Sequence, residues 1–420
     1  MATPSHSWIN TDQPQLIHVD LNSAFAMIEQ QANPLLRGKP VAMTNRLTRG
    51  ATIIAASYEA KRFGVGVGTK LGYAQELIPN LVALETDPAK YIHAYRVFSK
   101  IITSYSPNAH MKSIDEGIID FSNVASVRQP ADRPLEAIGY EIKARLKEEL
   151  GEWITCNIGI APNRFLAKLA AGLHKPNGLD IIDHKNLLDT YSQLRLTDLH
   201  GINRRYQARL NFAGIFSPLD LFHAGRQKLA KEAFRSINGD YWYLRLRGWE
   251  VDAAQTSTKT IGRQYVLHNW TAKDSELAPI LMKMCEGMGR RLRTKGLCAR
   301  GIYLHCWFVE GGGWKARKKF KTRLYSTPEL YAHAWALFAA RPKRTVKTLA
   351  VSCYGLEPAD TKQLNLFETG QEQNWRLTKA VDELNNRYGE FVVYPGLMAN
   401  TNQYVKEKIP FGTTKHFPSH

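Results

Sequence analysis

The stretch MKSIDEGIID, residues 111–120, joins the apolar, β-branched character of a buried strand to two neighbouring carboxylates, Asp115 and Glu116. Side chains alternate between the faces of a strand, so these two are expected to point to opposite faces. A third acid at another strand end would share a cation with one of them if the fold brings the strands together. Asp20, which ends the strand-like run LIHVD, is the candidate.

Segments with strand and helix character alternate over roughly the first 175 residues. The run begins with the strand pattern at 16–20 and closes with the helical pattern NRFLAKLAAGLHK, which Pro176 and Gly178 stop. This alternation predicts an α/β or α+β body. From 179 to 250 short helices with tight turns are expected. LTDLHGINRRYQARLNFAGI there has the spacing of a helix-hairpin-helix or of a plain helical hairpin.

Positive charge is concentrated in one part of the chain. The formal net charge is +18, and residues 261–350 hold 18 Lys and Arg against 5 Asp and Glu, a net of +13. A basic domain of this kind favours a polyanionic partner, because each neutralised phosphate releases condensed counterions. A basic surface that is only solvated is the alternative. Residues 251–260, VDAAQTSTKT, are small and polar and indicate a linker ahead of a small α+β domain.

Several classes of protein are disfavoured. The first 15 residues lack the apolar stretch of a signal peptide, and no run of about 18 apolar residues occurs, so a membrane span is not expected. The five cysteines are scattered without a CxxC pair, which favours reduced, packed thiols over disulfides or a metal site. We expect a soluble, intracellular protein of two to four domains, because 420 residues exceed what one core usually organises.

Three carboxylates on adjoining strands are the minimum set for holding two Mg²⁺ ions about 3.5 to 4 Å apart, as in-line nucleotidyl transfer requires. Mg²⁺ selects oxygen ligands and accepts substrate phosphates in its remaining positions. Asp20, Asp115 and Glu116 meet this description only if their strands are neighbours. Ordinary surface acids at strand ends are the alternative that spacing leaves open.

Four longer segments resemble the palm and fingers of the Y-family translesion DNA polymerases, in that family's order and spacing. They are HVDLNSAFAMIEQQANPLLRGKPVAM, SYEAKRFGV, SIDEGIIDFS and NIGIAPNRFLAKLAAGLHKPNG. The resemblance covers roughly residues 14–360 and extends to relatives of bacterial polymerase IV and of the polymerase V catalytic subunit. Position 22 is acidic in the former and Asn in the latter, so Asn22 leaves the subfamily open.

The resemblance implies an α+β multidomain, right-hand polymerase with an α/β palm, small fingers, a helical thumb and an α+β little finger. The expected division is palm 1–23 and 89–176, fingers 24–88, thumb 177–250 with the helix-hairpin-helix, linker 251–260, little finger 261–358 and a C-terminal extension 359–420. Within the extension, residues 374–398 have the pattern of a helix and a short strand.

The same resemblance implies the catalytic residues. Asp20, Asp115 and Glu116 match the family's metal ligands, and the backbone carbonyl of Leu21 matches a further ligand. Two Mg²⁺ ions are therefore the implied cofactor. Phe25 matches the aromatic steric gate that excludes a 2′-hydroxyl, with a core Phe on the first helix as the alternative.

Nucleotide contacts are implied at further positions. Tyr58 and Lys61 match the pair that contacts the triphosphate and lie i, i+3 on one helical face. Lys168 matches the second cationic contact. Lys61 stands where most relatives have Arg, and an ammonium cannot make the planar bidentate contact of a guanidinium. Thr52 and Ile54 share a strand face by period-two alternation and match the roof over the nascent base pair.

Primer-template DNA is the implied macromolecular substrate. The thumb hairpin would contact phosphates through Gly201, Arg204 and Arg205. In the little finger, WKARKKFKTR at 314–323 alternates basic with apolar or small residues. Its basic side chains are the remaining DNA contacts that we expect: Lys315, Arg317, Lys318, Lys319, Lys321 and Arg323.

KQLNLFE, residues 362–368, resembles the short bacterial peptide that binds the sliding clamp. Gln363 supplies an amide, and Leu364, Leu366 and Phe367 supply apolar anchors. A piece of buried helix or linker is the alternative. Accessory mutasome proteins are a further class of partner suggested by the extension.

The predicted function is templated addition of dNTPs to a primer 3′-hydroxyl, with low processivity and tolerance of damaged template bases, in the bacterial cytoplasm at the nucleoid. One alternative is a catalytically inactive, Y-family-like adaptor that binds DNA and the clamp; such adaptors have lost the acids that are present here. Another is a Mg²⁺-dependent nuclease or simple DNA-binding protein, which leaves Phe25, Tyr58, Lys61 and Lys168 without a shared purpose.

Overall fold

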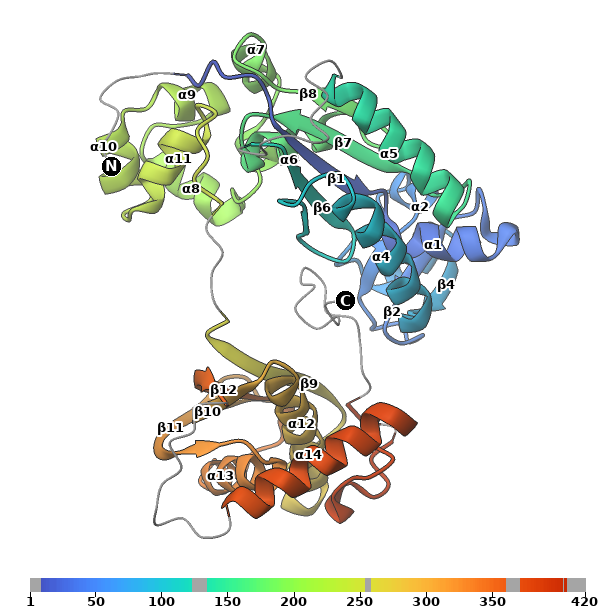
Figure 1. Cartoon of the computed structure of the whole chain (residues 1–420), viewed down its shortest axis with the longest axis vertical. Coiled ribbons are helices and arrows are strands. Elements are labelled where there is room, and N and C mark those ends of the chain that lie inside the picture. The colour runs from blue at the N-terminus through green and yellow to red at the C-terminus, as the bar shows by residue number, and fades with distance from the viewer. Residues whose placement is uncertain (1–8, 123–133, 254–257, 360–370, 403, 406–420) are drawn as a thin grey trace. The chain divides into compact units, whose positions relative to one another are not determined.

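The computed structural model describes residues 9–122, 134–253, 258–359, 371–402 and 404–405. The chain divides near residue 254 into two compact units, which are described separately (Figure 1). No helix within the described ranges is long and apolar enough to cross a membrane. All five cysteines are buried free thiols, which confirms the prediction from their spacing.

A five-stranded sheet forms the centre of the first unit, in the order β5-β6-β1-β7-β8. Its strands are β1 Leu16–Leu21, β5 His110–Met111, β6 Glu116–Asp120, β7 Cys156–Ala161 and β8 Leu179–Ile181. β1 lies between β6 and β7 and pairs antiparallel with both. A strand covered on both faces favours a short, mainly apolar run, and LIHVDL supplies one whose polar members are buried His18 and, near its end, Asp20.

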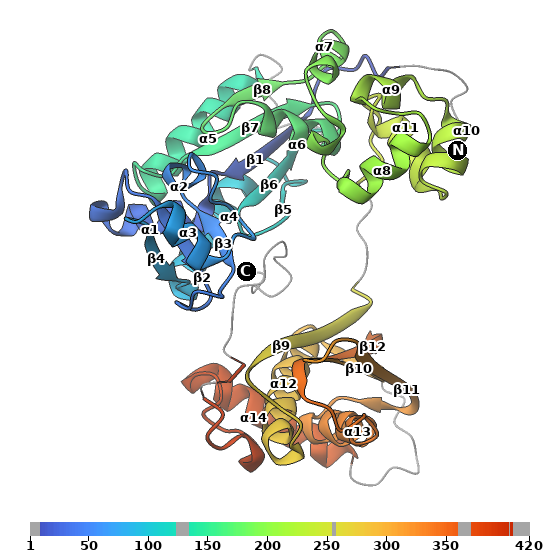
Figure 2. The same cartoon turned by 180° about the vertical axis from the view of Figure 1, so that it is seen from behind.

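Helices cover both faces of this sheet (Figures 1 and 2). α4 Pro88–Thr103 and α5 Leu135–Leu150 share a core with one face, and α6 Arg164–Leu173 packs on β1, β7 and β8 from the other. Gly159 on β7 permits the close approach of α6, because a Cβ there would lie 2.0 Å from the carbonyl oxygen of Ala167.

A three-stranded sheet in the order β3-β2-β4 follows β1 in the chain. Its strands are β2 Val41–Thr44, β3 Ile53–Ala56 and β4 Val82–Glu85. The helices of this segment are α1 Ala24–Ala32, η1 Pro34–Leu36, α2 Tyr58–Lys61 and α3 Leu71–Leu77. The hydroxyl of Ser57 accepts a hydrogen bond from the Ala60 amide, which caps α2 and begins that helix at Tyr58.

Short helical segments make up the rest of the first unit. In chain order they are α7 Leu187–Ser192, η2 Leu196–Asp198, α8 Arg204–Phe212, α9 Pro218–His223, α10 Arg226–Lys228, η3 Leu229–Ala233 and α11 Asn238–Arg245. They share one hydrophobic core with α6. β8 pairs with β7, so residues 179–181 belong to the central sheet and not to the thumb expected from residue 177. Three residues are too few to show a strand period in the sequence.

The second unit is a four-stranded antiparallel sheet in the order β11-β10-β12-β9, backed by two helices (Figure 2). The elements are β9 Thr260–Thr271, α12 Asp274–Thr294, β10 Leu297–Phe308, β11 Gly313–Leu324, α13 Thr327–Ala339 and β12 Val346–Pro358. From Ile302 to the end of β10 every second residue, including Leu304 and Cys306, is buried in the core with α12 and α13. The small α+β domain expected after the linker is therefore found.

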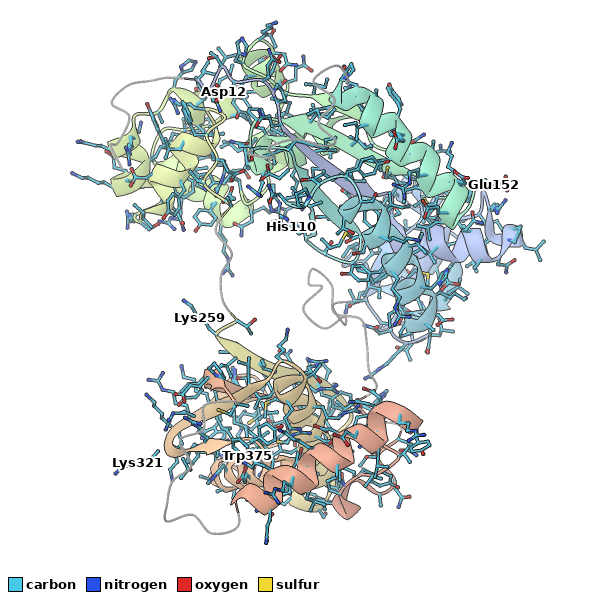
Figure 3. The ribbon with its side chains drawn as sticks, viewed as in Figure 1. Asp12, His110, Glu152, Lys259, Lys321 and Trp375 are labelled. Atoms are coloured by element: carbon cyan, nitrogen blue, oxygen red, sulfur yellow. The ribbon has the colours of Figure 1, made fainter. Side chains whose placement is uncertain are left out.

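The C-terminal helix α14, Gln371–Tyr388, packs on the second unit. Arg293 of α12 is 3% exposed, and its Nε and Nη2 atoms lie 2.5 and 2.9 Å from the two carboxylate oxygens of Asp382. Trp375 stacks on Tyr325 with ring centroids 4.3 Å apart (Figure 3). An ion pair and an aromatic stack thus attach the extension to α12 and to Tyr325, the residue that follows β11.

The short strand expected in 374–398 is not found there, since the described residues 389–398 form turns and the 3-10 helix η4 Gly396–Met398. The side chain of Asn385 bonds to the backbone N and O of Val393, at 2.9 and 2.8 Å. The apolar run FVVY therefore pairs with a side chain of α14 instead of a neighbouring strand.

Asp382→Ala is expected to loosen α14, because removing one partner of a buried ion pair costs on the order of 3 kcal/mol. Hydrogen exchange of the α14 amides in the full chain should accelerate roughly 100-fold. Glu383→Ala, at an exposed neighbouring position, is the matched control. Equal protection of α14 in the two variants would contradict the role assigned to the ion pair.

Candidate active site

Asp20, Asp115 and Glu116 meet at one end of the central sheet. Asp20 on β1 and Glu116 on β6 are directly paired in the antiparallel register. The side chains of such a pair lie next to each other on one face of the sheet. Asp115 precedes β6, and its carbonyl accepts a hydrogen bond from the Leu21 amide at 2.9 Å. The fold therefore brings the backbones of all three acids together.

The prediction that Asp115 and Glu116 are neighbours on one strand is wrong for Asp115. β6 begins at Glu116, and Asp115 lies in the turn before it. The Ser113 hydroxyl bonds to the Asp115 carboxylate at 2.5 Å, and the amides of Lys112 and Ser113 both donate to the carbonyl of Glu116. Because these bonds close a tight turn, strand alternation does not set the direction of the Asp115 side chain.

Each strand-end acid contacts a lysine. Lys168 Nζ lies 2.7 and 2.8 Å from the two carboxylate oxygens of Glu116, and Lys175 bonds to Asp20. Burial raises the pKa of Asp20 against the opposing charge of Lys175. Burial would also raise the pKa of Glu116, but the charge and hydrogen bond of Lys168 bring it below its usual value. Among the described residues no three His, Cys, Asp or Glu side chains converge as a ready ligand group.

The two lysines lie at different parts of the site. Lys168 is on α6 beside Glu116, whereas Lys175 is in the loop after α6 beside Asp20. Burial, followed by the charge of Lys175, lowers the pKa of Lys61 on α2. Sequence reasoning named Lys168 and missed Lys175. The turn HKPNG was the available signal, because it returns the chain to the sheet.

Asn22 connects the segments around the acids. Its side chain is buried, and its nitrogen donates to Asn157 Oδ1 at 2.6 Å and to the Tyr58 hydroxyl at 3.3 Å. Its oxygen accepts from the Thr155 hydroxyl at 2.9 Å and from the Asn177 amide at 3.0 Å. The amide thus uses its full bonding capacity to tie β1 to β7, to α2 and to the loop that carries Lys175.

Tyr58 and Lys61 lie together on α2, as their spacing predicts. Lys61 Nζ stands 4.6 Å from the centroid of the Tyr58 ring and donates to the Ser23 hydroxyl at 2.6 Å. Ser23 has φ 46°, a left-handed conformation at the junction of β1 and α1. The pair is therefore joined, through Lys61, to Ser23, the residue directly before the first helix.

Phe25 on α1 is 3% exposed and stacks on Tyr91 of α4, with ring centroids 4.2 Å apart and planes 12° apart. This position satisfies the alternative of a core Phe on the first helix.

Thr52 and Ile54 share one face of the chain around β3, with Ile53 fully buried on the other. Thr52 is exposed and Ile54 half-buried. Lys70 Nζ donates to the Thr52 hydroxyl at 2.9 Å, and the two residues form an isolated bridge. The period-two alternation predicted for this pair is found, whereas their role over a base pair stays a prediction.

Comparison with known proteins supplies the family. Residues 19–172 match the impB/mucB/samB family and residues 258–366 match the impB/mucB/samB family C-terminal domain. The DNA polymerase IV of Moorella thermoacetica is 32% identical over 384 residues, which cover 89% of this chain and 94% of that protein. The chain belongs to the Y-family DNA polymerases. The DNA polymerase IV of Pelotomaculum thermopropionicum is 28% identical over 408 residues, 96% of this Y-family chain and 99% of its own.

Solved structures agree with the fold of this Y-family polymerase. The Y-family DNA polymerase chimera Dbh-Dpo4(243-245)-Dbh matches with a TM-score of 0.69 at 25% identity, over 81% of this chain and 98% of the other. An insertion ternary complex of Dbh DNA polymerase has a TM-score of 0.57 at 24% identity and shares the fold. The α+β multidomain polymerase fold and the translesion DNA polymerase activity predicted from the sequence are confirmed.

In the segment of the Y-family polymerase that is expected to form the thumb, the predicted phosphate contacts lie at the start of α8. Asn203 caps α8, with its side chain accepting from the amides of Arg205 and Tyr206, each at 3.0 Å. Arg204 and Arg205 are exposed. Gly201 has φ 99°, a conformation that favours glycine. The predicted glycine turn before a helix with two exposed arginines is therefore present.

In the second unit of the polymerase, the predicted cations of β11 lie on different faces of the strand. Lys315 and Arg317 are register partners of His305 and Tyr303, half-buried residues that alternate with the core residues of β10. Lys318 lies on the other face, with its Nζ 5.5 Å from the ring of Phe320. Lys319 and Lys321 are exposed, Lys321 extending outward in Figure 3, and Arg323 lies 3.7 Å from Glu357.

The predicted clamp peptide falls outside the described residues. Gln363, Leu364, Leu366 and Phe367 lie in the segment 360–370, so their role stays a prediction.

Asn22→Ala is expected to destabilise the first unit by about 1 to 3 kcal/mol. The substitution removes the hydrogen-bond partner of the Asn157 side-chain oxygen and of the Asn177 amide in this network. Urea denaturation followed by a first-unit probe measures this loss. Tyr58→Phe is the matched comparison, since it removes one contact of the network and should cost less. Equal losses in the two variants would contradict a network centred on Asn22.

Proposed function

We propose that this Y-family polymerase extends a primer at the cluster of Asp20, Asp115 and Glu116. The observation that carries the proposal is the register of β1 and β6, which sets Asp20 opposite Glu116 and joins Asp115 to Leu21. Acids placed this close in a partly buried position need positive charge, since like charges directly opposite each other destabilise a sheet. The reaction is attack of the primer 3′-hydroxyl on the α-phosphorus of a dNTP, with pyrophosphate leaving.

Mg²⁺ fits the donor chemistry of this cluster. Its oxygen ligands would come from Asp20, Asp115, Glu116 and the carbonyl of Leu21, and the contacts of both strand-end acids with ammonium groups indicate a site that stabilises cations. Two bound ions would neutralise charge that develops on the reacting phosphate and favour the ionised form of the attacking hydroxyl. Lys168 and Lys175 would release the carboxylates when the ions bind.

Tyr58, Lys61 and Lys175 would then orient the triphosphate. Lys175 is supported by its contact with Asp20 and by its charge acting on Lys61 and Tyr58. Lys168 would keep a second cation near the Glu116 side of the site. Charge-assisted hydrogen bonds to phosphate fix geometry as well as binding energy, so these residues act by positioning and electrostatics.

We assign the specificity of nucleotide insertion to Phe25 and to the pair Thr52 and Ile54. Phe25 would meet the nucleotide sugar and exclude a 2′-hydroxyl. Thr52 and Ile54 would cover the nascent base pair. Half-buried Ile54 and exposed Thr52 offer a roof of moderate size.

Primer-template DNA would be held through phosphates by Arg204 and Arg205 and by the exposed cations of β11. Lys318 is also exposed but lies over Phe320 on the other face of the strand, and half-buried Arg323 lies beside Glu357. Binding should weaken steeply with salt. A bacterial sliding clamp would bind at 362–368 and lengthen otherwise short tracts of synthesis, with accessory mutasome proteins as further partners in the cytoplasm at the nucleoid.

Asp115→Ala and Glu116→Ala are expected to reduce primer extension in Mg²⁺ by roughly 100-fold or more, because each removes a proposed metal ligand. Extension on undamaged and abasic templates, with DNA affinity measured alongside, is the test. Tight, salt-sensitive DNA binding without extension by the wild-type chain would support the inactive adaptor or the need for a partner.

Lys175→Ala is expected to raise the KM for dNTP by about tenfold, since a hydrogen bond between charged groups is lost. Steady-state kinetics of single-nucleotide insertion measure it. Lys168→Ala should affect KM less, because Lys168 lies on the Glu116 side. A larger increase of KM in Lys168→Ala than in Lys175→Ala would instead support Lys168 as the triphosphate contact that the sequence suggested.

A further inference from the structure

A buried carboxylate lies behind the ring of Phe25. Glu29 is 5% exposed and occupies the position one helical turn after Phe25 on α1. One of its oxygens accepts a hydrogen bond from the hydroxyl of Tyr91 at 2.9 Å. The other accepts from Lys90 Nζ at 2.8 Å. Both partners come from α4, so this carboxylate joins the helix of Phe25 to the helix behind it.

Tyr91 transmits this attachment to Phe25. Its side chain is fully buried, and its ring is the surface on which Phe25 stacks at 4.2 Å. The hydroxyl at the far end of the ring is held by Glu29. A stacked pair keeps its geometry only while both rings stay in place. The bond between Tyr91 and Glu29 is therefore one of the contacts that hold the ring on which Phe25 stacks.

Packing alone does not account for a carboxylate at this position. A buried ion pair is often no more stabilising than apolar residues of similar volume, although breaking one partner is strongly destabilising. The carboxylate adds a directional contact, because its hydrogen bond with the Tyr91 hydroxyl fixes where that end of the ring lies. Burial raises the pKa of Tyr91, so the hydroxyl keeps its proton and remains the donor.

We propose that Glu29 and Tyr91 are positioning residues for sugar discrimination: the bond between them holds the Tyr91 ring, and the ring holds Phe25 where a ribonucleotide 2′-hydroxyl would collide with it. The inference rests on the proposed steric-gate function of Phe25. It adds that the gate is a three-residue device, Phe25, Tyr91 and Glu29, whose inner part never touches the nucleotide.

The test is the ratio of kcat/KM for dCTP to that for CTP opposite a template guanine, measured with the full chain. Tyr91→Phe removes only the hydroxyl, and Glu29→Gln keeps the size of the side chain while removing its charge. Each is expected to lower the ratio roughly 3- to 10-fold, mainly through a lower KM for CTP, because one positioning hydrogen bond is lost or weakened. The double variant should lower the ratio no further than the stronger single variant.

Lys90→Ala is the matched control. It removes the partly exposed partner of Glu29, whose side chain is 43% exposed, and leaves the Tyr91 hydroxyl bonded. Its ratio is expected to equal that of the wild type. Thermal unfolding of every variant separates a general loosening from a positional effect, since loosening would lower the rates with dCTP and CTP together and leave their ratio in place.

Phe25→Val distinguishes failure of this inference from failure of the gate. If Phe25→Val raises CTP use while Tyr91→Phe and Glu29→Gln retain the wild-type ratio, the gate stands and the positioning role is overturned. If Phe25→Val itself leaves the ratio unchanged, the gate is rejected, and the positioning role falls with it. A reduced ratio in all three, with Lys90→Ala unchanged, supports the device.

Discussion

Two carboxylates that face each other across a buried antiparallel pair, Asp20 on β1 and Glu116 on β6, set the condition that the rest of the first unit satisfies. Like charges in such a place destabilise the sheet unless cations accompany them. Lys168 and Lys175 supply the cations, and both come from α6 and the loop that follows it. That helix has to lie close to β7, which explains why Gly159 stands where any side chain would collide with its backbone.

The segment from Asp20 to Glu29 carries most of the proposed chemistry within ten residues. Asp20 is the penultimate residue of β1, Asn22 ties the end of the strand to α2 and to the loop with Lys175, and Phe25 and Glu29 lie one turn apart on α1. Because these groups share one strand-to-helix junction, the placement of the junction positions the metal-binding and sugar-facing groups together. Ser23, in a left-handed conformation, is where the chain changes direction.

Local patterns predicted what depends on neighbours in the chain. Tyr58 and Lys61 were found together because a helix brings i and i+3 to one face, and Thr52 and Ile54 were found on one face because side chains alternate along a strand. Short or side-chain-dependent features were missed. β8 has three residues, Asp115 is turned by Ser113, and the run at 391–394 bonds to Asn385 instead of forming a strand.

The sequence by itself determined the family, the α+β division of the chain, the acidic cluster and the concentration of positive charge in the second unit, because motif spacing and composition are properties of the chain. Only the tertiary structure decided which lysine contacts which acid. Lys168 and Lys175 are seven residues apart, which a helix would place on one face. α6 ends at Leu173, however, and the following loop carries Lys175 away to Asp20. The same holds for Glu29, whose importance depends on Tyr91, a residue 62 positions away that only the packing of α4 on α1 brings to it.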